Sequence, residues 1–133
     1  MSENQAIAPG SIDLSGVEAF AYSPGVRRGN MLFISGQVPR DRNGALVGEG
    51  NIEAQCVQVY ENIKAVVEAA GGTMADIVDT TVIVTDNSYK AAHTTVRKRY
   101  FQPPYPCSTA LIAGLSPGYL IEVNAIAILE TDN

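Results

Sequence analysis

The polar side chains best able to do chemistry in this sequence interrupt apolar segments near its C-terminal end. Glu122 and Asn124 lie within the apolar run over 120–129. Because successive side chains of a strand point to opposite faces, both would share one face with Leu120 and Ile126. A partly buried carboxyl has a raised pKa and can position or deprotonate a water molecule. An ordinary charge at a sheet edge is the alternative, and the sequence leaves both interpretations open.

A second group of candidates consists of small residues beside proline or glycine. Ser108 and Thr109 follow Pro106-Cys107 at the start of an apolar run. Their hydroxyls would either contact a ligand or bond to nearby backbone groups. Ser35-Gly36 ends another apolar run, and the missing side chain of Gly36 allows a ligand to approach backbone N–H groups closely. A plain turn explains the same pair equally well.

Two ring side chains also allow more than one interpretation. Tyr22 precedes the Pro24-Gly25 turn and would either cover the core or contact a ligand. His93, the single histidine, falls on a predicted helix, where surface or packing roles compete with a catalytic one. With one histidine and no nucleophile elbow we predict no Ser-His-Asp triad, and no glycine-rich phosphate loop is present. No Cys/His group has zinc-ligand spacing, so we expect no metal.

The elements that must position these residues follow from the apolar pattern. Asn51 is a good N-cap for a helix with apolar side chains at helical spacing, which the Gly71-Gly72 pair stops. A second helix follows the cap at Asp86-Asn87-Ser88 and ends before Pro103-Pro104. Gly29-Asn30 predicts a hairpin turn. The predicted strands cover 19–23, 31–36, 45–47, 77–85, 107–113 and 120–129.

This order of elements predicts an α+β domain in which two helices pack on one face of a mixed sheet. The chain has 133 residues, which is too short for two domains that each have a hydrophobic core. We expect residues 1–16 to form a loosely held arm and residues 17–133 to form the single domain.

Composition narrows the classes of partner and compartment. Apolar residues make up 46% of the chain and charged residues 17%, which leaves more apolar surface than a small monomer easily hides. The net charge of −5 and the scattered basic residues argue against nucleic acid. No apolar run approaches the ~20 residues that span a bilayer, and the N-terminus lacks a signal-peptide pattern. Cys56 and Cys107 are expected to be buried thiols of a cytoplasmic protein.

Five stretches, in the same order from Tyr22 to Leu129, resemble the successive motifs of the RidA (YjgF-type) family. The resemblance implies a chorismate-mutase-like fold, assembled as a trimeric barrel with small-molecule clefts between subunits. The stretches are Tyr22-Ser23-Pro24-Gly25-Val26, Gly29-Asn30-Met31-Leu32-Phe33-Ile34-Ser35-Gly36-Gln37, Ile52-Glu53-Ala54-Gln55, Glu61-Asn62-Ile63-Lys64-Ala65-Val66 and Ile121-Glu122-Val123-Asn124-Ala125-Ile126-Ala127.

The same resemblance implies an activity and a set of site residues. Family members of the RidA type hydrolyse imines and enamines to ketoacids and ammonia without a cofactor. Glu122 would hold the attacking water. The residues implied to bind substrate are Tyr22, Ser35, Gly36, Cys107, Ser108 and Thr109, with His93 and Asn124 as further candidates.

One stretch departs from the family pattern. Deaminases of this type carry Pro-Ala-Arg-Ser, whose arginine grips the substrate carboxylate, whereas Ser108 stands at that position here. A neutral hydroxyl cannot replace a bidentate guanidinium, and the lost pair is worth about 2–3 kcal/mol of binding. His93 also stands where the family usually has asparagine, and Pro24 where it has glutamine.

Two functions follow from this departure. The first is an imine or enamine hydrolase with altered specificity, for a neutral substrate or an acid placed differently. The second is a non-catalytic trimer that binds a small metabolite or has a regulatory role. Ribonuclease activity, claimed for some relatives, fits poorly with the acidic charge.

Overall fold

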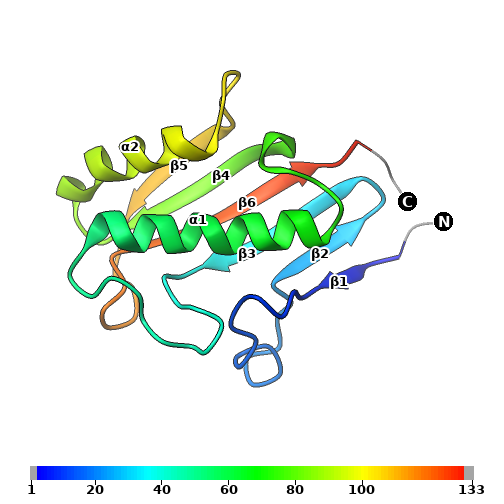
Figure 1. Ribbon diagram of the computed structural model, residues 1–133, viewed down its shortest axis with the longest axis horizontal. Coiled ribbons are helices and arrows are strands. Elements are labelled where there is room, and N and C mark those ends of the chain that lie inside the picture. The colour runs from blue at the N-terminus through cyan, green and yellow to red at the C-terminus, as the bar shows by residue number, and fades with distance from the viewer. Residues whose placement is uncertain (1–2, 131–133) are drawn as a thin grey trace.

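Six strands form one mixed sheet, and two long helices cover one of its faces (Figure 1). The computed structural model describes residues 3–130. The elements are β1 (Gln5–Ile7), β2 (Gly25–Arg28), β3 (Met31–Gln37), α1 (Ile52–Ala69), η1 (Met74–Asp76), β4 (Ile77–Val84), η2 (Asn87–Tyr89), α2 (Lys90–Tyr100), β5 (Cys107–Ile112) and β6 (Ile121–Ile128). The strand order is β1-β2-β3-β6-β4-β5, and only β4 and β5 pair in parallel. The predicted α+β fold is confirmed.

The long helix α1 forms where the sequence predicts it. The Asn51 side chain accepts a hydrogen bond from the Ala54 N–H at 3.0 Å, which satisfies one free donor of the first turn. Gly71 follows the helix with a φ of 90°, a conformation that glycine adopts readily. The apolar stripe of α1 packs onto the sheet. The fully buried side chains of this layer include Val59, Ile63 and Val66 of α1 and Leu32, Val82, Ile121 and Val123 of the sheet.

The N-terminal segment differs from the sequence prediction. Residues 3–16 are not a loosely held arm, because β1 pairs with β2 and both Ile7 and Ile12 are buried. Three residues of strand carry too short a pattern to be detected in the sequence. Met1 and Ser2, and residues 131–133 at the other end, lie outside the described residues.

The strand predicted over 19–23 is also absent, and turns take its place. The Phe20 N–H donates to the Gly16 carbonyl at 2.9 Å, and Ala21 has a φ of 53°. A residue in this left-handed region cannot continue an extended strand. The hairpin partner of β3 is therefore β2, which joins it across the predicted Gly29-Asn30 turn. The predicted strand over 45–47 is reduced to one isolated bridge.

The face of the sheet opposite the helices is apolar and uncovered in the single chain. Phe33 of β3 and Ile128 of β6 expose 45% of their surface on strands whose alternate residues are buried, and Leu111 of β5 exposes 48%. All six residues of β5 are exposed, because β5 is an edge strand. Cys107 is its first residue, so the expectation of two buried thiols is wrong for Cys107 and right for Cys56.

Candidate functional site

Glu122 lies on β6 and points to the uncovered face of the sheet. Its neighbours Ile121 and Val123 are fully buried under the helices, whereas Glu122 itself is half-buried. A Cβ atom built on Gly36 would lie 2.9 Å from the Cδ of Glu122, so the carboxyl packs where only glycine leaves room. Burial raises the pKa of Glu122. The arrangement provides a carboxyl able to exchange a proton with a bound molecule.

Ser35 and Gly36 lie at an irregularity in the pairing of β3 with β6. The register shifts between Ile34 and Gln37. The Ser35 hydroxyl donates to the Ser23 carbonyl at 2.6 Å, and the Ser35 N–H donates to the Pro24 carbonyl at 2.9 Å. Ser35 therefore ties the segment that carries Tyr22 to the end of β3, and its hydroxyl hydrogen is already engaged.

Asn124 and Thr109 share the uncovered face with Glu122. Asn124 of β6 pairs with Thr81 of β4, and Thr81 pairs with Thr109 of β5. Paired residues of adjacent strands point to the same face, so these three side chains form a polar row across the sheet. Cys107 lies two residues before Thr109 on the same face of β5.

Ser108 is not brought next to Glu122 within one chain. Strand β4 separates β5 from β6, and Ser108 pairs with Thr80 whereas Glu122 pairs with Ile83. Two strand spacings correspond to ~10 Å across the sheet, and three residues to a further ~10 Å along it. Direct proximity of the two side chains would require two copies of the chain.

His93 lies on the opposite side of the sheet, buried between α1 and α2. Its Nε2 is 2.6 Å from the Tyr60 hydroxyl, with the rings stacked at a centroid distance of 5.7 Å. Burial, aided by the positive charge of Arg97, lowers the pKa of His93 to about 4. The imidazole is therefore neutral at pH 7, and its position is that of a packing residue.

Arg97 completes this buried cluster, which the sequence analysis missed. Its guanidinium donates to the Thr80 hydroxyl at 2.8 Å and to the Pro106 carbonyl at 3.0 Å. The Thr80 hydroxyl in turn donates to the Cys107 carbonyl at 3.2 Å. The cluster thereby fixes the start of β5. The only sequence signal for it is the four-residue spacing of His93 and Arg97, which places both on one helix face.

A pocket of about 110 Å³ lies between the loop over 12–22 and the end of β3. Two of the predicted site residues, Tyr22 and Gly36, line it. The residues that the sequence analysis missed are Asp13, Gln37, Arg40 and Asn62. Gly36 thus lines the pocket and also packs against the Glu122 carboxyl, which does not itself line the pocket.

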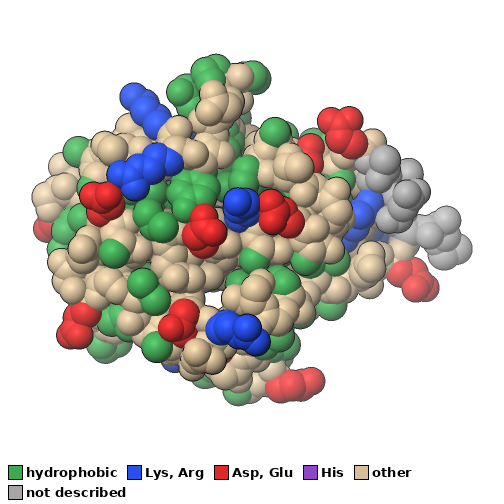
Figure 2. Space-filling model, viewed as in Figure 1, with side chains coloured by type: hydrophobic (Ala, Val, Ile, Leu, Met, Phe, Trp, Pro, Cys, Tyr) green, Lys and Arg blue, Asp and Glu red, His purple; other side chains and the backbone are tan. Residues whose placement is uncertain are grey.

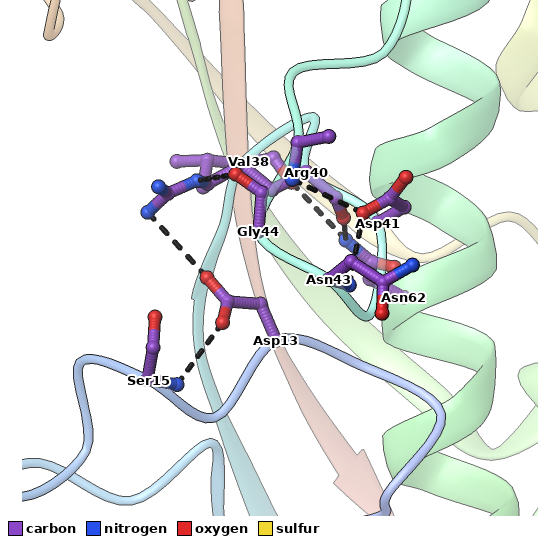
Figure 3. A network of polar contacts seen from close by, with 9 residues as sticks. Asp13, Ser15, Val38, Arg40, Asp41, Asn43, Gly44 and Asn62 are labelled. Atoms are coloured by element: carbon purple, nitrogen blue, oxygen red, sulfur yellow. Dashed lines mark hydrogen bonds and ion pairs between the residues drawn. The ribbon is translucent and has the colours of Figure 1, made fainter.

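Two residues that line the pocket, Asp13 and Arg40, form an ion pair (Figure 3). Asp13 reaches from the N-terminal loop to within 3.4 Å of one terminal nitrogen of Arg40, whose Nε donates to the Gly44 carbonyl at 3.0 Å. The Asn62 amide donates to the Val38 and Arg40 carbonyls at 3.1 and 3.0 Å, which fixes this segment on α1. A hydrogen bond from the Ser15 N–H is the main reason that the pKa of Asp13 is lowered.

The residues over 3–130 contain no group of three His, Cys, Asp or Glu side chains that could hold a metal ion. In the same range no helix is long and apolar enough to cross a bilayer.

Comparison with known proteins gives matches over nearly the whole chain. The model of the family described as endoribonuclease L-PSP matches residues 16–129. A RutC family protein of Pyrococcus horikoshii is 39% identical over 110 residues, which are 82% of this chain and 87% of that protein. A 2-iminobutanoate/2-iminopropanoate deaminase of Dermatophagoides farinae is 33% identical over 110 residues, 82% of this chain and 86% of that protein.

Solved structures give the same result. RidA from an Antarctic Psychrobacter species superposes with a TM-score of 0.85 at 35% identity, covering 94% of this chain and 99% of that one. A putative endoribonuclease from Thermotoga maritima has a TM-score of 0.87 at 34% identity, covering 96% and 99%.

Proposed function

Because the chain belongs to the RidA (YjgF-type) family, we propose that it is a cytoplasmic homotrimer that hydrolyses imines or enamines without a cofactor. In this proposal Glu122 holds the attacking water in a cleft between subunits, and the substrate specificity is altered. The observation that carries the proposal is the half-buried Glu122 carboxyl, packed against Gly36 with a pKa raised by burial. A relative named as an imine deaminase adds support.

The uncovered apolar face supports assembly of several copies. Phe33, Leu111 and Ile128 leave apolar surface in water that a second copy would bury. The polar row of Asn124, Thr81 and Thr109 lies on the same face and would then line the cleft. A sedimentation experiment on the intact protein should give three times the chain mass of 14.1 kDa.

The chemistry requires one group that can both accept and donate a proton. The Glu122 carboxylate accepts a proton from water as the water oxygen bonds to the carbon of the protonated imine, which gives a neutral carbinolamine. The carboxylic acid then returns its proton to the amine, the C–N bond breaks as the C=O bond forms, the hydroxyl proton passes to solvent, and ammonia leaves. A raised pKa suits this exchange because it brings the carboxyl closer to the working pH.

Ser108 supports a change in substrate. Its side chain is exposed at the start of β5 and carries no charge. Arg97, which lies near the start of β5, is buried and already donates to Thr80 and Pro106. The proposed substrate is therefore a neutral imine, or an acid whose carboxylate is held elsewhere.

The charge distribution supports small molecules over RNA. On the face seen in Figure 2, Lys and Arg side chains are interspersed with Asp and Glu and form no basic stripe. The net charge of −5 would oppose binding to phosphates. We expect no RNA cleavage above the background of a Glu122→Gln preparation.

The test is ammonia release from imines generated by an amino-acid oxidase. Glu122→Gln should lower the rate by about 100-fold or more, because the amide cannot exchange the proton. Glu68→Gln is the matched control, since Glu68 is exposed on α1. Lack of turnover by the natural protein across a varied set of neutral and acidic imines would contradict the hydrolase.

A non-catalytic metabolite-binding trimer is the second candidate, and Ser108 in place of the family arginine is the observation that favours it. A bound metabolite stabilises the folded state by RT ln(1 + [L]/Kd). Thermal shifts with a metabolite that the protein does not turn over would support this candidate, and the absence of shifts across a broad metabolite set would remove it.

A further inference from the structure

The pocket beside the end of β3 is large enough for part of a small molecule. Its volume of about 110 Å³ exceeds what a single water needs, which is roughly 10–15 Å³ by the same kind of measure. Phe20 and Tyr22 stand at its rim and are 80% and 41% exposed. The two rings place aromatic surface at the mouth of the pocket, which a molecule bound there would cover.

Polar groups with unused bonding capacity face this pocket. Arg40 uses its Nε and one terminal nitrogen, and the second terminal nitrogen makes no hydrogen bond to any residue over 3–130. The side-chain carbonyl of Gln37 accepts no hydrogen bond within the same range, and it is not itself fully buried. The Tyr22 hydroxyl is likewise without a partner among the described residues. These groups are open to solvent, so a molecule bound in the pocket would replace water as their hydrogen-bond partner.

The charges of the pocket cancel each other. Arg40 and Asp13 lie 3.4 Å apart, and the lowered pKa of Asp13 keeps its carboxylate ionised at pH 7. A carboxylate ligand at Arg40 would be repelled by the negative charge of Asp13. An ammonium ligand at Asp13 would be repelled by the positive charge of Arg40. A neutral group with a carbonyl and an N–H side by side satisfies both residues at once.

The loop that carries the rim is shaped for this pocket. Ala21 holds a φ of 53°, which non-glycine residues seldom adopt, and it lies between the two rim aromatics. A Cβ built on Gly16 would lie 3.2 Å from the Phe20 ring and 3.3 Å from the Tyr22 hydroxyl. A side chain at position 16 would push these rings away by a few tenths of an ångström, so the glycine favours the observed positions of the rim residues.

From these observations we propose that the pocket binds a primary carboxamide, with the carbonyl on Arg40 and the N–H groups on Asp13 and Gln37. Gly36 lines the pocket and also packs against Glu122. A substrate held by its carboxamide would extend past Gly36 towards the carboxyl. This last step rests on the proposed function, whereas carboxamide binding itself does not.

The test is a titration of the intact protein with acetamide, followed by heteronuclear NMR. Acetamide should shift the Gln37 side-chain amide and the Arg40 Nε signals saturably. Acetate and ethylammonium, which have similar size, should bind more weakly than acetamide by a factor of about ten or greater. Equal binding of acetate, or shifts confined to other residues, would overturn the assignment.

Two variants test whether the charge of Asp13 controls which ligand binds. Asp13→Asn keeps an acceptor for the Ser15 N–H but removes the charge beside Arg40, so acetate should gain about tenfold in affinity. Asp41→Asn is the control: Asp41 does not line the pocket, and asparagine can still accept from the Asn43 and Ala45 N–H groups. An unchanged acetate affinity in Asp13→Asn, or an equal gain in Asp41→Asn, would overturn the proposal.

The outcome is separable from that of the proposed function. Glu122→Gln should bind acetamide with unchanged affinity, because Glu122 does not line the pocket. Saturable acetamide binding by a protein that hydrolyses no imine would support the pocket and contradict the hydrolase. Imine hydrolysis without acetamide binding would overturn the pocket alone.

Discussion

Each face of the sheet holds a titratable side chain that is at least partly removed from bulk water, and the two side chains differ in their hydrogen-bond partners. On the helix-covered face, His93 is buried and bonded to Tyr60, next to an Arg97 that also has its partners inside the chain. On the uncovered face, Glu122 is half-buried, and burial raises its pKa. A buried group whose partners are complete holds a fold together. A desolvated carboxyl left without a partner costs stability, and such groups concentrate at functional sites.

The largest expected effect concerns the covered face. Arg97→Met should destabilise the protein by about 3 kcal/mol, because buried acceptors at Thr80 and Pro106 lose a charged donor. Arg99→Met is the control, since Arg99 makes an exposed ion pair with Glu53 worth under about 1 kcal/mol. Urea unfolding at one fixed protein concentration measures both. Equal losses would contradict the structural role of the buried cluster.

The pH dependence of stability should show the same contrast. The pKa of His93 falls from 6.5 in the unfolded chain to about 4 in the folded one, so only the unfolded chain takes up the proton between these values. Stability therefore rises with pH from about 4 to 6.5, by an amount on the order of 3 kcal/mol at most. His93→Gln should flatten this part of the curve. An unchanged slope would mean that His93 is not neutral when buried.

The uncovered face should respond in activity more than in stability. Gly36→Ala would place a Cβ 2.9 Å from the Cδ of Glu122 and displace the carboxyl, which should cost about tenfold in kcat/KM. The displaced carboxyl is the end of a flexible side chain, so the loss in unfolding free energy should stay below about 1 kcal/mol. Gly114→Ala is the control, because nothing lies within 4 Å of a Cβ there. A stability loss without an activity loss would make Gly36 a packing residue.

The smallest expected effect has the opposite sign. Glu122→Gln removes a carboxylate whose charged form burial disfavours, so it should raise stability at pH 7 slightly, by less than about 1 kcal/mol. Above the raised pKa the carboxyl is charged in both states, and burial makes the charged form less favourable in the folded protein than in the unfolded chain. Removing the charge therefore raises the free energy of unfolding. Thermal unfolding at pH 7 and pH 4 checks it, with the gain present only at pH 7. A loss of stability at pH 7 would indicate that Glu122 has a stabilising partner.

Local patterns in the sequence predicted the elements better than the site. The Asn51 cap and the apolar spacing of α1 are local, and so is the alternation that places Glu122 and Asn124 on one face of β6. The absent strand over 19–23 has an ordinary sequence, and its geometry depends on the left-handed conformation of Ala21.

Contacts between distant segments had no local signal. Tyr60 meets His93 across 33 residues of chain, and Asp13 meets Arg40 from a loop whose shape the sequence did not reveal. Both contacts depend on how the helices and loops pack onto the sheet. The polar groups of the pocket were missed for this reason, although each residue is visible in the sequence.

The measurement that tests the central claim most directly is activity recovered in mixed trimers. Glu122→Gln lacks the carboxyl, and Ser108→Trp would block the cleft from the exposed edge strand, so each variant alone should be inactive. If Glu122 of one copy works beside Ser108 of the next, equal co-expression should restore about a quarter of the clefts by random assortment. Ammonia release near a quarter of the natural rate is the result expected. Activity no higher than that of the separate variants would contradict a cleft shared between subunits.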